Sequence, residues 1–163
     1  MSRLDSFIRR LEAQRACIDR AVTLAAPLPG PVIEVGLGNG RTYDHLRDRA
    51  KGREIFAFDR HVAAHPACVP DAAHLLLGDF RVTLVQAAST LGGKVAICHA
   101  DIGSGDEAAS QALGAAIAPL IDALMAPGGI VVGDQVMRAA RWEELPLPPG
   151  IEPGRYFIRR VRA

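Results

Sequence analysis

The residues with the clearest chemical potential are five acids, each of which stands at the end of a short apolar segment. These acids are Glu34, Asp59, Asp79, Asp101 and Asp134. A lone acid in such a place is usually a helix cap or a turn residue. If the five segments are parallel strands of one sheet, however, their carboxyl ends share one edge, which is where open α/β sheets bind ligands. The sequence therefore predicts one crevice surrounded by carboxylates.

A glycine-rich turn follows the first of these acids. Gly36, Gly38 and Gly40 alternate directly after Glu34, and a turn of this kind between strand and helix aims backbone N–H groups at a ligand. A pyrophosphate fits poorly, because like charges about 5 Å apart repel by about 3 kcal/mol at an effective dielectric constant of about 20. Arg41 also stands where the dinucleotide fingerprint requires glycine or alanine. A nucleoside that carries an amino acid removes the conflict, since Glu34 attracts its ammonium group and the N–H groups receive its carboxylate.

The hydrophobic pattern predicts the elements that position these residues. Apolar runs indicate strands at 31–35, 53–60, near 77, 94–101 and 129–134, and they alternate with helical patterns at 2–24, 40–49, 81–91 and 106–125. The Ala-Pro-Gly-Gly segment at 126–129 is expected to cap the last helix. Continuously apolar strands favour a parallel sheet covered on both faces, and two extended segments within 141–162 favour an antiparallel hairpin at its edge. The fold class predicted is a three-layer α/β/α sandwich with a mostly parallel sheet and an antiparallel C-terminal edge hairpin.

Length, charge and cysteine content exclude several classes of protein. The 163 residues predict a single domain, with an N-terminal helix at 1–26, a ligand-binding core at 31–134 and the edge hairpin at 135–163. A net charge of +1 gives no electrostatic footprint for nucleic acid or membranes. Three separated cysteines without a C-x-x-C pair indicate neither a zinc ribbon nor a disulfide framework. Charges throughout the first 24 residues argue against a signal peptide, so we expect a cytoplasmic protein.

The ordered motifs resemble those of class I S-adenosylmethionine-dependent methyltransferases. V-I-E-V-G-L-G-N-G at 32–40 resembles the first motif of that family, I-F-A-F-D-R at 55–60 the second and L-L-L-G-D-F at 75–80 the third. V-A-I-C-H-A-D at 95–101 and L-M-A-P-G-G-I-V-V-G-D at 124–134 resemble the fourth and fifth segments. The resemblance covers 31–134 and implies a Rossmann-like fold, S-adenosylmethionine as cofactor and methyl transfer as the reaction.

The resemblance also implies roles for individual residues. Asp59 is expected to bind the ribose hydroxyls, Asp79 the adenine amino group, and Phe80 to pack on the adenine ring. The cofactor-binding residues predicted are Glu34, Gly36, Gly38, Asn39, Gly40, Thr42, Asp59, Arg60, Gly78, Asp79, Phe80 and Asp101. Asp101 and His99 are the catalytic candidates. For His99 the alternative is a buried, hydrogen-bonded histidine inside the fourth strand.

The methyl acceptor and the possibility of a metal are less constrained by sequence. G-G-I-V-V-G-D-Q-V at 128–136 is similar to a segment of metal-dependent catechol-type O-methyltransferases, in which Asp101, Asp134 and Gln135 would occupy metal positions. Ser104 stands where those enzymes carry a lysine, and Gln135 replaces an asparagine, so no metal is assigned.

We therefore expect a methyltransferase that acts on a small molecule, with neither nucleic acid nor membrane as partner. The alternatives are a non-catalytic protein that binds S-adenosylmethionine or S-adenosylhomocysteine, and a nicotinamide-dependent oxidoreductase. Glu34 and Arg41 count against the oxidoreductase. The apolar stripe of the first predicted helix offers a docking face for a homo-oligomer.

Overall fold

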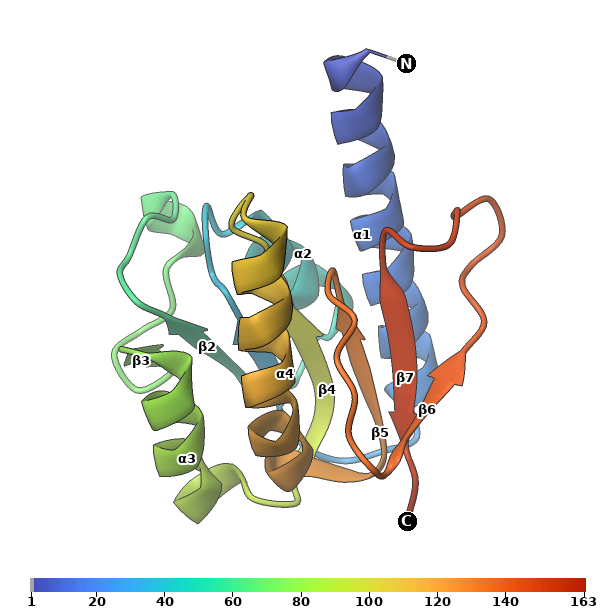
Figure 1. The fold of residues 1–163 in the computed structure, drawn as a ribbon. Helices are drawn as coiled ribbons and strands as arrows, with labels where there is room; N and C mark the ends of the chain where they lie inside the picture. Colours follow the sequence, from blue (N-terminus) through green and yellow to red (C-terminus); the bar gives the residue numbers. More distant parts are fainter. Residues whose placement is uncertain (1) are drawn as a thin grey trace.

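One mixed sheet with the strand order β3-β2-β1-β4-β5-β7-β6 forms the centre of the computed structural model, which describes residues 2–163 (Figure 1). Strands β1 to β5 are parallel, whereas β7 pairs antiparallel with both β5 and β6. The strands are β1 Val32–Val35, β2 Ile55–Asp59, β3 Leu75–Leu77, β4 Val95–Ala100, β5 Met125–Gly133, β6 Trp142–Leu145 and β7 Phe157–Val161. The predicted edge hairpin is thus confirmed, with β6 outermost.

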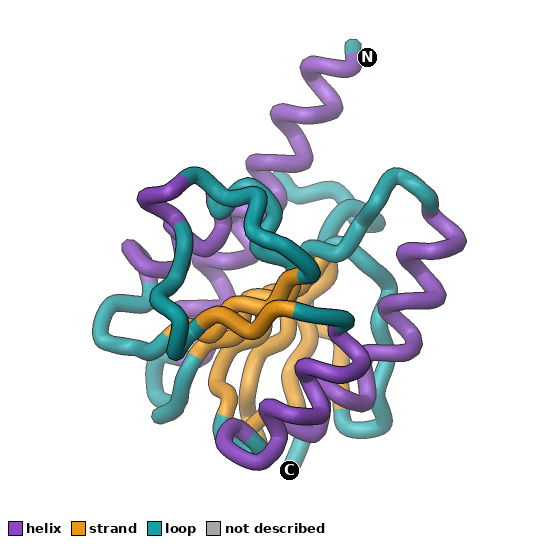
Figure 2. Tube along the Cα trace, turned by 90° about the vertical axis from the view of Figure 1, so that its left-hand side faces the viewer, coloured by secondary structure: helices purple, strands orange, loops and turns teal. Residues whose placement is uncertain are grey.

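Helices cover both faces of the sheet, as the continuously apolar strands predict (Figure 2). The helices are α1 Arg3–Ala25, α2 Arg41–Arg49, α3 Phe80–Leu91 and α4 Glu107–Leu124, with a short 3-10 turn η1 at Pro66–Cys68. Two hydrophobic clusters lie on opposite faces, one beneath α3 and α4 and the other beneath α1 and α2. Alternation along β4 sends Cys98 to the first cluster and Ile97 to the second. The three-layer Rossmann-like architecture is therefore confirmed.

The junction between α4 and β5 differs from the sequence prediction. The predicted cap at 126–129 is wrong, because β5 begins at Met125, directly after α4 ends at Leu124. Met125 pairs with Val95, and regular pairing resumes only at Ile97 and Ile130. The glycine-rich segment is therefore accommodated as an irregularity within the strand, with Gly128 at φ +82°.

Helix α1 is longer than the sheet that it covers. Its start is fixed by a capping box, in which the Ser2 hydroxyl accepts from the Asp5 N–H and the Asp5 carboxylate accepts from the Ser2 N–H. Cys17 and Ile18 in its second half are buried against the sheet. Its first half projects past the end of the sheet where the parallel strands terminate (Figures 1 and 2). None of the helices in the described chain has the length and apolarity needed to cross a membrane.

Candidate active site

The glycine turn joins β1 to α2 and forms the centre of the site. Gly36 has φ +93° and Gly38 has φ +52°, a region that residues with a side chain rarely adopt. A Cβ atom on Gly36 would overlap the carbonyl oxygen of Asp101, so the turn and the end of β4 can approach only because this residue is glycine. A Cβ atom on Gly38 would meet nothing within 4 Å. The turn is therefore packed on one side and open on the other.

A cleft of about 520 Å³ lies on the open side of the turn, beyond the carboxyl ends of the strands. It has the place that ligand sites take in open α/β sheets. The predicted cofactor residues that line this cleft are Gly36, Gly38, Asp59, Arg60, Phe80 and Asp101. Ile102, Gly103 and Ser104, which follow β4, and Ala109, Ser110 and Leu113 of α4 line it as well.

Asp59 connects the end of β2 to the glycine turn. Its Oδ2 atom accepts a hydrogen bond of 2.9 Å from the Gly38 N–H, and its Oδ1 atom accepts one of 2.6 Å from the Arg60 N–H. The carboxylate is therefore held in a fixed orientation at the cleft, and its predicted contact with the ribose hydroxyls stays a prediction.

Asp79 has a different role in the fold from Asp59. It is the N-cap of α3, and its Oδ1 atom accepts from the Arg81 N–H at 2.8 Å. Neither Asp79 nor Gly78 is among the residues that line the cleft, whereas Phe80 is. The structure thus supports the ordinary capping interpretation of Asp79, and its predicted contact with adenine stays a prediction.

A second hollow, of about 230 Å³, adjoins the cleft at the glycine turn. The two spaces share Gly36, Gly38, Asp101 and Gly103. Asn39 and Thr42, both predicted from the sequence, line the second hollow, as do Leu37 and Arg41. The remaining lining residues are Phe7, Arg10, Leu11 and Gln14 of α1, which the sequence did not assign to the site.

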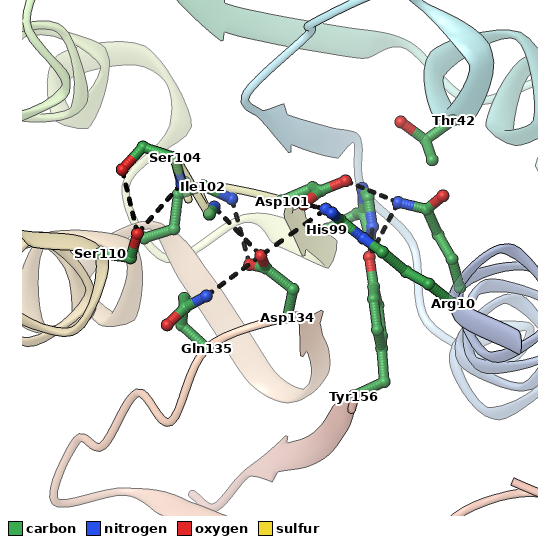
Figure 3. A network of polar contacts seen from close by, with 12 residues as sticks. Arg10, Thr42, His99, Asp101, Ile102, Ser104, Ser110, Asp134, Gln135 and Tyr156 are labelled. Atoms are coloured by element: carbon green, nitrogen blue, oxygen red, sulfur yellow. Dashed lines mark hydrogen bonds and ion pairs between the residues drawn. The ribbon is translucent and has the colours of Figure 1, made fainter. Parts of the chain in front are cut away.

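Asp101 lies between the two spaces, and α1 holds both of its carboxylate oxygens (Figure 3). Its Oδ1 atom accepts from Arg10 Nη2 and its Oδ2 atom from Gln14 Nε2, each at 2.7 Å. Burial opposes the charge of Arg10, but the carboxylates of Asp101 and Asp134 outweigh it and raise the pKa of the guanidinium. The fold therefore brings residues about 90 positions apart into one ion pair.

Asp134 lies deeper and organises the loop that follows β4. Its side chain is 9% exposed, and its oxygens accept from the N–H groups of Ile102 and Gly103 at 3.1 and 3.0 Å. Burial and the neighbouring charge of Asp101 raise the pKa of Asp134. Among residues 2–163, no group of three or more histidine, cysteine, aspartate or glutamate side chains is arranged to hold a metal ion.

A buried chain of polar side chains runs beneath the glycine turn. His99 Nδ1 lies 2.7 Å from Glu34 Oε2, and His99 Nε2 lies 2.7 Å from the Tyr156 hydroxyl. Thr42 donates its hydroxyl to Glu34 Oε1, and Gln14 Nε2 reaches Tyr156 at 3.1 Å. Burial opposes the charged form of His99, but Glu34 outweighs it and raises the pKa of the imidazole.

These buried hydrogen bonds change the interpretation of two predicted site residues. Glu34 and His99 have no exposed side-chain surface, and neither lines the cleft or the second hollow. His99 is thus the buried, hydrogen-bonded histidine of the alternative interpretation, because alternation along β4 points it under α1 rather than beyond the strand end. Of the five acids expected to surround one crevice, only Asp59 and Asp101 line it. Gly40, also predicted, lies outside both spaces and caps α2.

Comparisons with known proteins agree with this geometry. A family model described as S-adenosyl-L-methionine methyltransferase matches residues 1–161. A crystal structure of an S-adenosyl-L-methionine methyltransferase from Silicibacter pomeroyi DSS-3 is 46% identical, covers 99% of both chains and superposes with a TM-score of 0.94. No match was found among curated protein sequences.

More distant structures share the fold alone. TrmN from Thermus thermophilus is 17% identical, with a TM-score of 0.62 over 88% of this chain and 48% of its own. A 16S rRNA (adenine(1408)-N(1))-methyltransferase from Catenulisporales acidiphilia is 13% identical, with a TM-score of 0.51 over 90% and 91% of the two chains.

The family match over nearly the whole chain, together with the cleft at the strand ends, leads to one conclusion: the chain belongs to the S-adenosyl-L-methionine methyltransferase family, and S-adenosylmethionine is its cofactor.

Proposed function

We propose that the protein transfers the methyl group of S-adenosylmethionine to a small-molecule acceptor. The observation that carries the proposal is the pair of spaces that meet at Gly36, Gly38 and Asp101. The larger cleft, with Asp59 and Phe80 on its walls, fits the nucleoside. The smaller hollow, with polar groups of the turn and of α1, fits the amino-acid end.

The chemistry asks little of the protein beyond alignment. S-adenosylmethionine supplies a methyl group that its sulfonium already activates, so the chain has to exclude water and hold an acceptor in line. The loop that follows β4, held by Asp134, forms one wall of the cleft. Phe7 and Leu11 of α1 add apolar surface to the adjoining hollow. A net charge of +1 does not favour a polyanionic acceptor, and this supports a small acceptor.

A non-catalytic role is the second candidate, and one observation favours it. Both oxygens of Asp101, the one catalytic candidate that lines the cleft, are bonded to Arg10 and Gln14. A protein that only binds the cofactor has no need of a free base at this point.

Methyl transfer from radiolabelled S-adenosylmethionine tests the proposal. The purified protein is incubated with a small-metabolite extract or, separately, with total RNA from the same cells, and Asp59→Ala serves as the cofactor-site control. Label in the small-molecule fraction that is lost with Asp59→Ala supports the proposal. Label only in RNA would overturn the choice of acceptor. Binding of S-adenosylhomocysteine without transfer to either pool would favour the non-catalytic role.

A further inference from the structure

We infer that Arg10 and Asp101 bind the amino-acid end of S-adenosylmethionine, with its carboxylate on Arg10 and its ammonium group on Asp101. The inference deepens the proposed function and rests on the cofactor site described there. It assigns the ammonium group to Asp101, which the sequence already predicts to be a cofactor-binding residue, in place of Glu34. It assigns the carboxylate to Arg10 in place of the N–H groups of the glycine turn.

Glu34 is unsuited to direct contact with a ligand. Its carboxylate is fully buried, one oxygen faces His99 and the other accepts the hydroxyl of Thr42. A buried carboxylate with these partners gains nothing from an ammonium group on the far side of the turn, and exposing it would leave His99 without its counter-charge. Glu34 therefore positions Thr42, which does line the second hollow.

The second hollow carries the opposite charges that a zwitterion needs. Asp101 is the one acidic residue on its wall among the described residues, and Arg10 and Arg41 are the basic ones. Arg10 and Asp101 lie 2.7 Å apart and pair with each other. A zwitterion placed between them exchanges one ion pair for two charge-assisted contacts. Because the Arg10 side chain is 44% exposed, its ion pair with Asp101 contributes little to stability, so breaking the pair to admit a ligand costs little free energy.

The surroundings let Arg10 turn while Asp101 stays in place. Gln14 donates to Asp101 and also reaches the buried hydroxyl of Tyr156, so the carboxylate keeps a second anchor. Asp134 Oδ2 lies 3.9 Å from Arg10 Nη2 and keeps the guanidinium near the hollow. Arg10 and Gln14 are one helical turn apart on α1, and both line the second hollow. Helix α1 is thereby part of the cofactor site, although it lies outside the 31–134 core.

A pair of related ligands tests this assignment. S-adenosylhomocysteine and 5′-methylthioadenosine share the nucleoside thioether, but only the first has an amino-acid end. Titration calorimetry measures both ligands with the wild type, Arg10→Met, Asp101→Asn and Arg9→Met. Arg9 is the matched control, because it neighbours Arg10 on α1 but pairs with Glu152 and lines a different hollow.

We expect Arg10→Met and Asp101→Asn each to weaken S-adenosylhomocysteine binding by about tenfold or more, the effect of losing a charge-assisted contact. Binding of 5′-methylthioadenosine should change less than about twofold, and Arg9→Met should change neither. Arg10→Lys, which keeps the charge without the planar fork, should lie between the wild type and Arg10→Met.

Three outcomes would overturn the assignment. The first is an equal loss of affinity for both ligands, which would mean that Arg10 acts by docking α1. The second is no loss of affinity for either ligand. The third is a selective loss of S-adenosylhomocysteine affinity with Arg41→Met but not with Arg10→Met. If the wild type bound neither ligand, the proposed cofactor site itself would fail, which is a distinct result. Thermal unfolding of each unliganded variant confirms that the comparison is made between folded proteins.

Discussion

The Nδ1 atom of His99 lies 2.7 Å from the Oε2 atom of Glu34, and neither side chain has exposed surface. The two residues come from adjacent parallel strands and are direct neighbours in the β1–β4 register. Their contact supports the glycine turn from below, because Glu34 also accepts from Thr42 in the first turn of α2. Glu34, the acid of the first motif, thus has a structural role: it links β1 to β4 and to the start of α2.

The stability of this pair should depend on pH. Because the pKa of His99 is raised above its ordinary value of 6.5, its stabilising contribution is complete below about pH 6.5 and is lost as the pH rises through the folded value. We expect the difference in free energy of unfolding between the wild type and His99→Gln to shrink as the pH increases from 6 to 9. Urea unfolding across this range measures it, and a difference that grows with pH would contradict the assignment.

Removal of the Tyr156 hydroxyl should destabilise the fold. The hydroxyl pairs with His99 Nε2 at 2.7 Å and with Gln14 Nε2 at 3.1 Å, and the whole residue is buried. Tyr156→Phe leaves a buried polar atom without a partner and should cost about 1–3 kcal/mol in the free energy of unfolding. Tyr43→Phe is the control, since the Tyr43 hydroxyl makes no hydrogen bond within residues 2–163 and its loss should change little. Equal changes in the free energy of unfolding for the two substitutions would show that the hydrogen bonds of the Tyr156 hydroxyl add no stability.

A comparison of two glycines distinguishes the energetic cost of backbone strain from the cost of steric overlap. Gly36 and Gly52 both have positive φ, but only at Gly36 would a Cβ atom overlap a neighbour, the carbonyl oxygen of Asp101. Gly52→Ala should cost about 1 kcal/mol from the backbone conformation alone. Gly36→Ala should cost at least about 2 kcal/mol, because the turn and the end of β4 must also move apart. Chemical denaturation measures both, and similar costs would mean that the close approach is not required.

If Asp59 binds the ribose as predicted, Asp59→Ala removes charge-assisted hydrogen bonds and should weaken S-adenosylhomocysteine binding by about 1.5–3 kcal/mol. The same substitution releases the N–H of Gly38, so the turn loses an anchor as well. Calorimetric titration gives the affinity, with Asp48→Ala as an exposed control on α2. Unchanged affinity would remove Asp59 from the cofactor site.

The three cysteines should differ sharply in reactivity. Burial raises the pKa of Cys17 to about 11 and that of Cys98 further, whereas Cys68 lies half-buried in η1. Because the thiolate is the reactive form, a thiol reagent at pH 8 should modify Cys68 alone in the native protein and all three residues in denaturant. Peptide mass spectrometry assigns the sites. Rapid modification of Cys17 in the native state would show that α1 detaches from the sheet.

Much of the architecture follows from the sequence. Apolar strands without alternation indicate burial on both faces, and intervening helical periods indicate crossovers, so the sequence pattern predicts a parallel sheet with two helical layers. The strands named from the sequence are present, and the hairpin closes the edge. The predicted start of β5 at Gly129 is wrong, because proline and glycine signal a turn locally, whereas the pairing of Met125 with Val95 extends the strand through them.

The sequence by itself determined the glycine turn, the succession of strands and helices along the chain and the edge of the sheet at which the cleft lies, because these depend on local spacing and pattern. Only the tertiary structure decided which side chains meet there. Arg10 reaches Asp101 across 91 positions, and Tyr156 reaches His99 across 57. A local pattern tells which face a residue occupies, but the partner on that face is set by how distant helices and strands pack. The same packing makes Glu34 and His99 a buried hydrogen-bonded pair and places residues of α1 at the site.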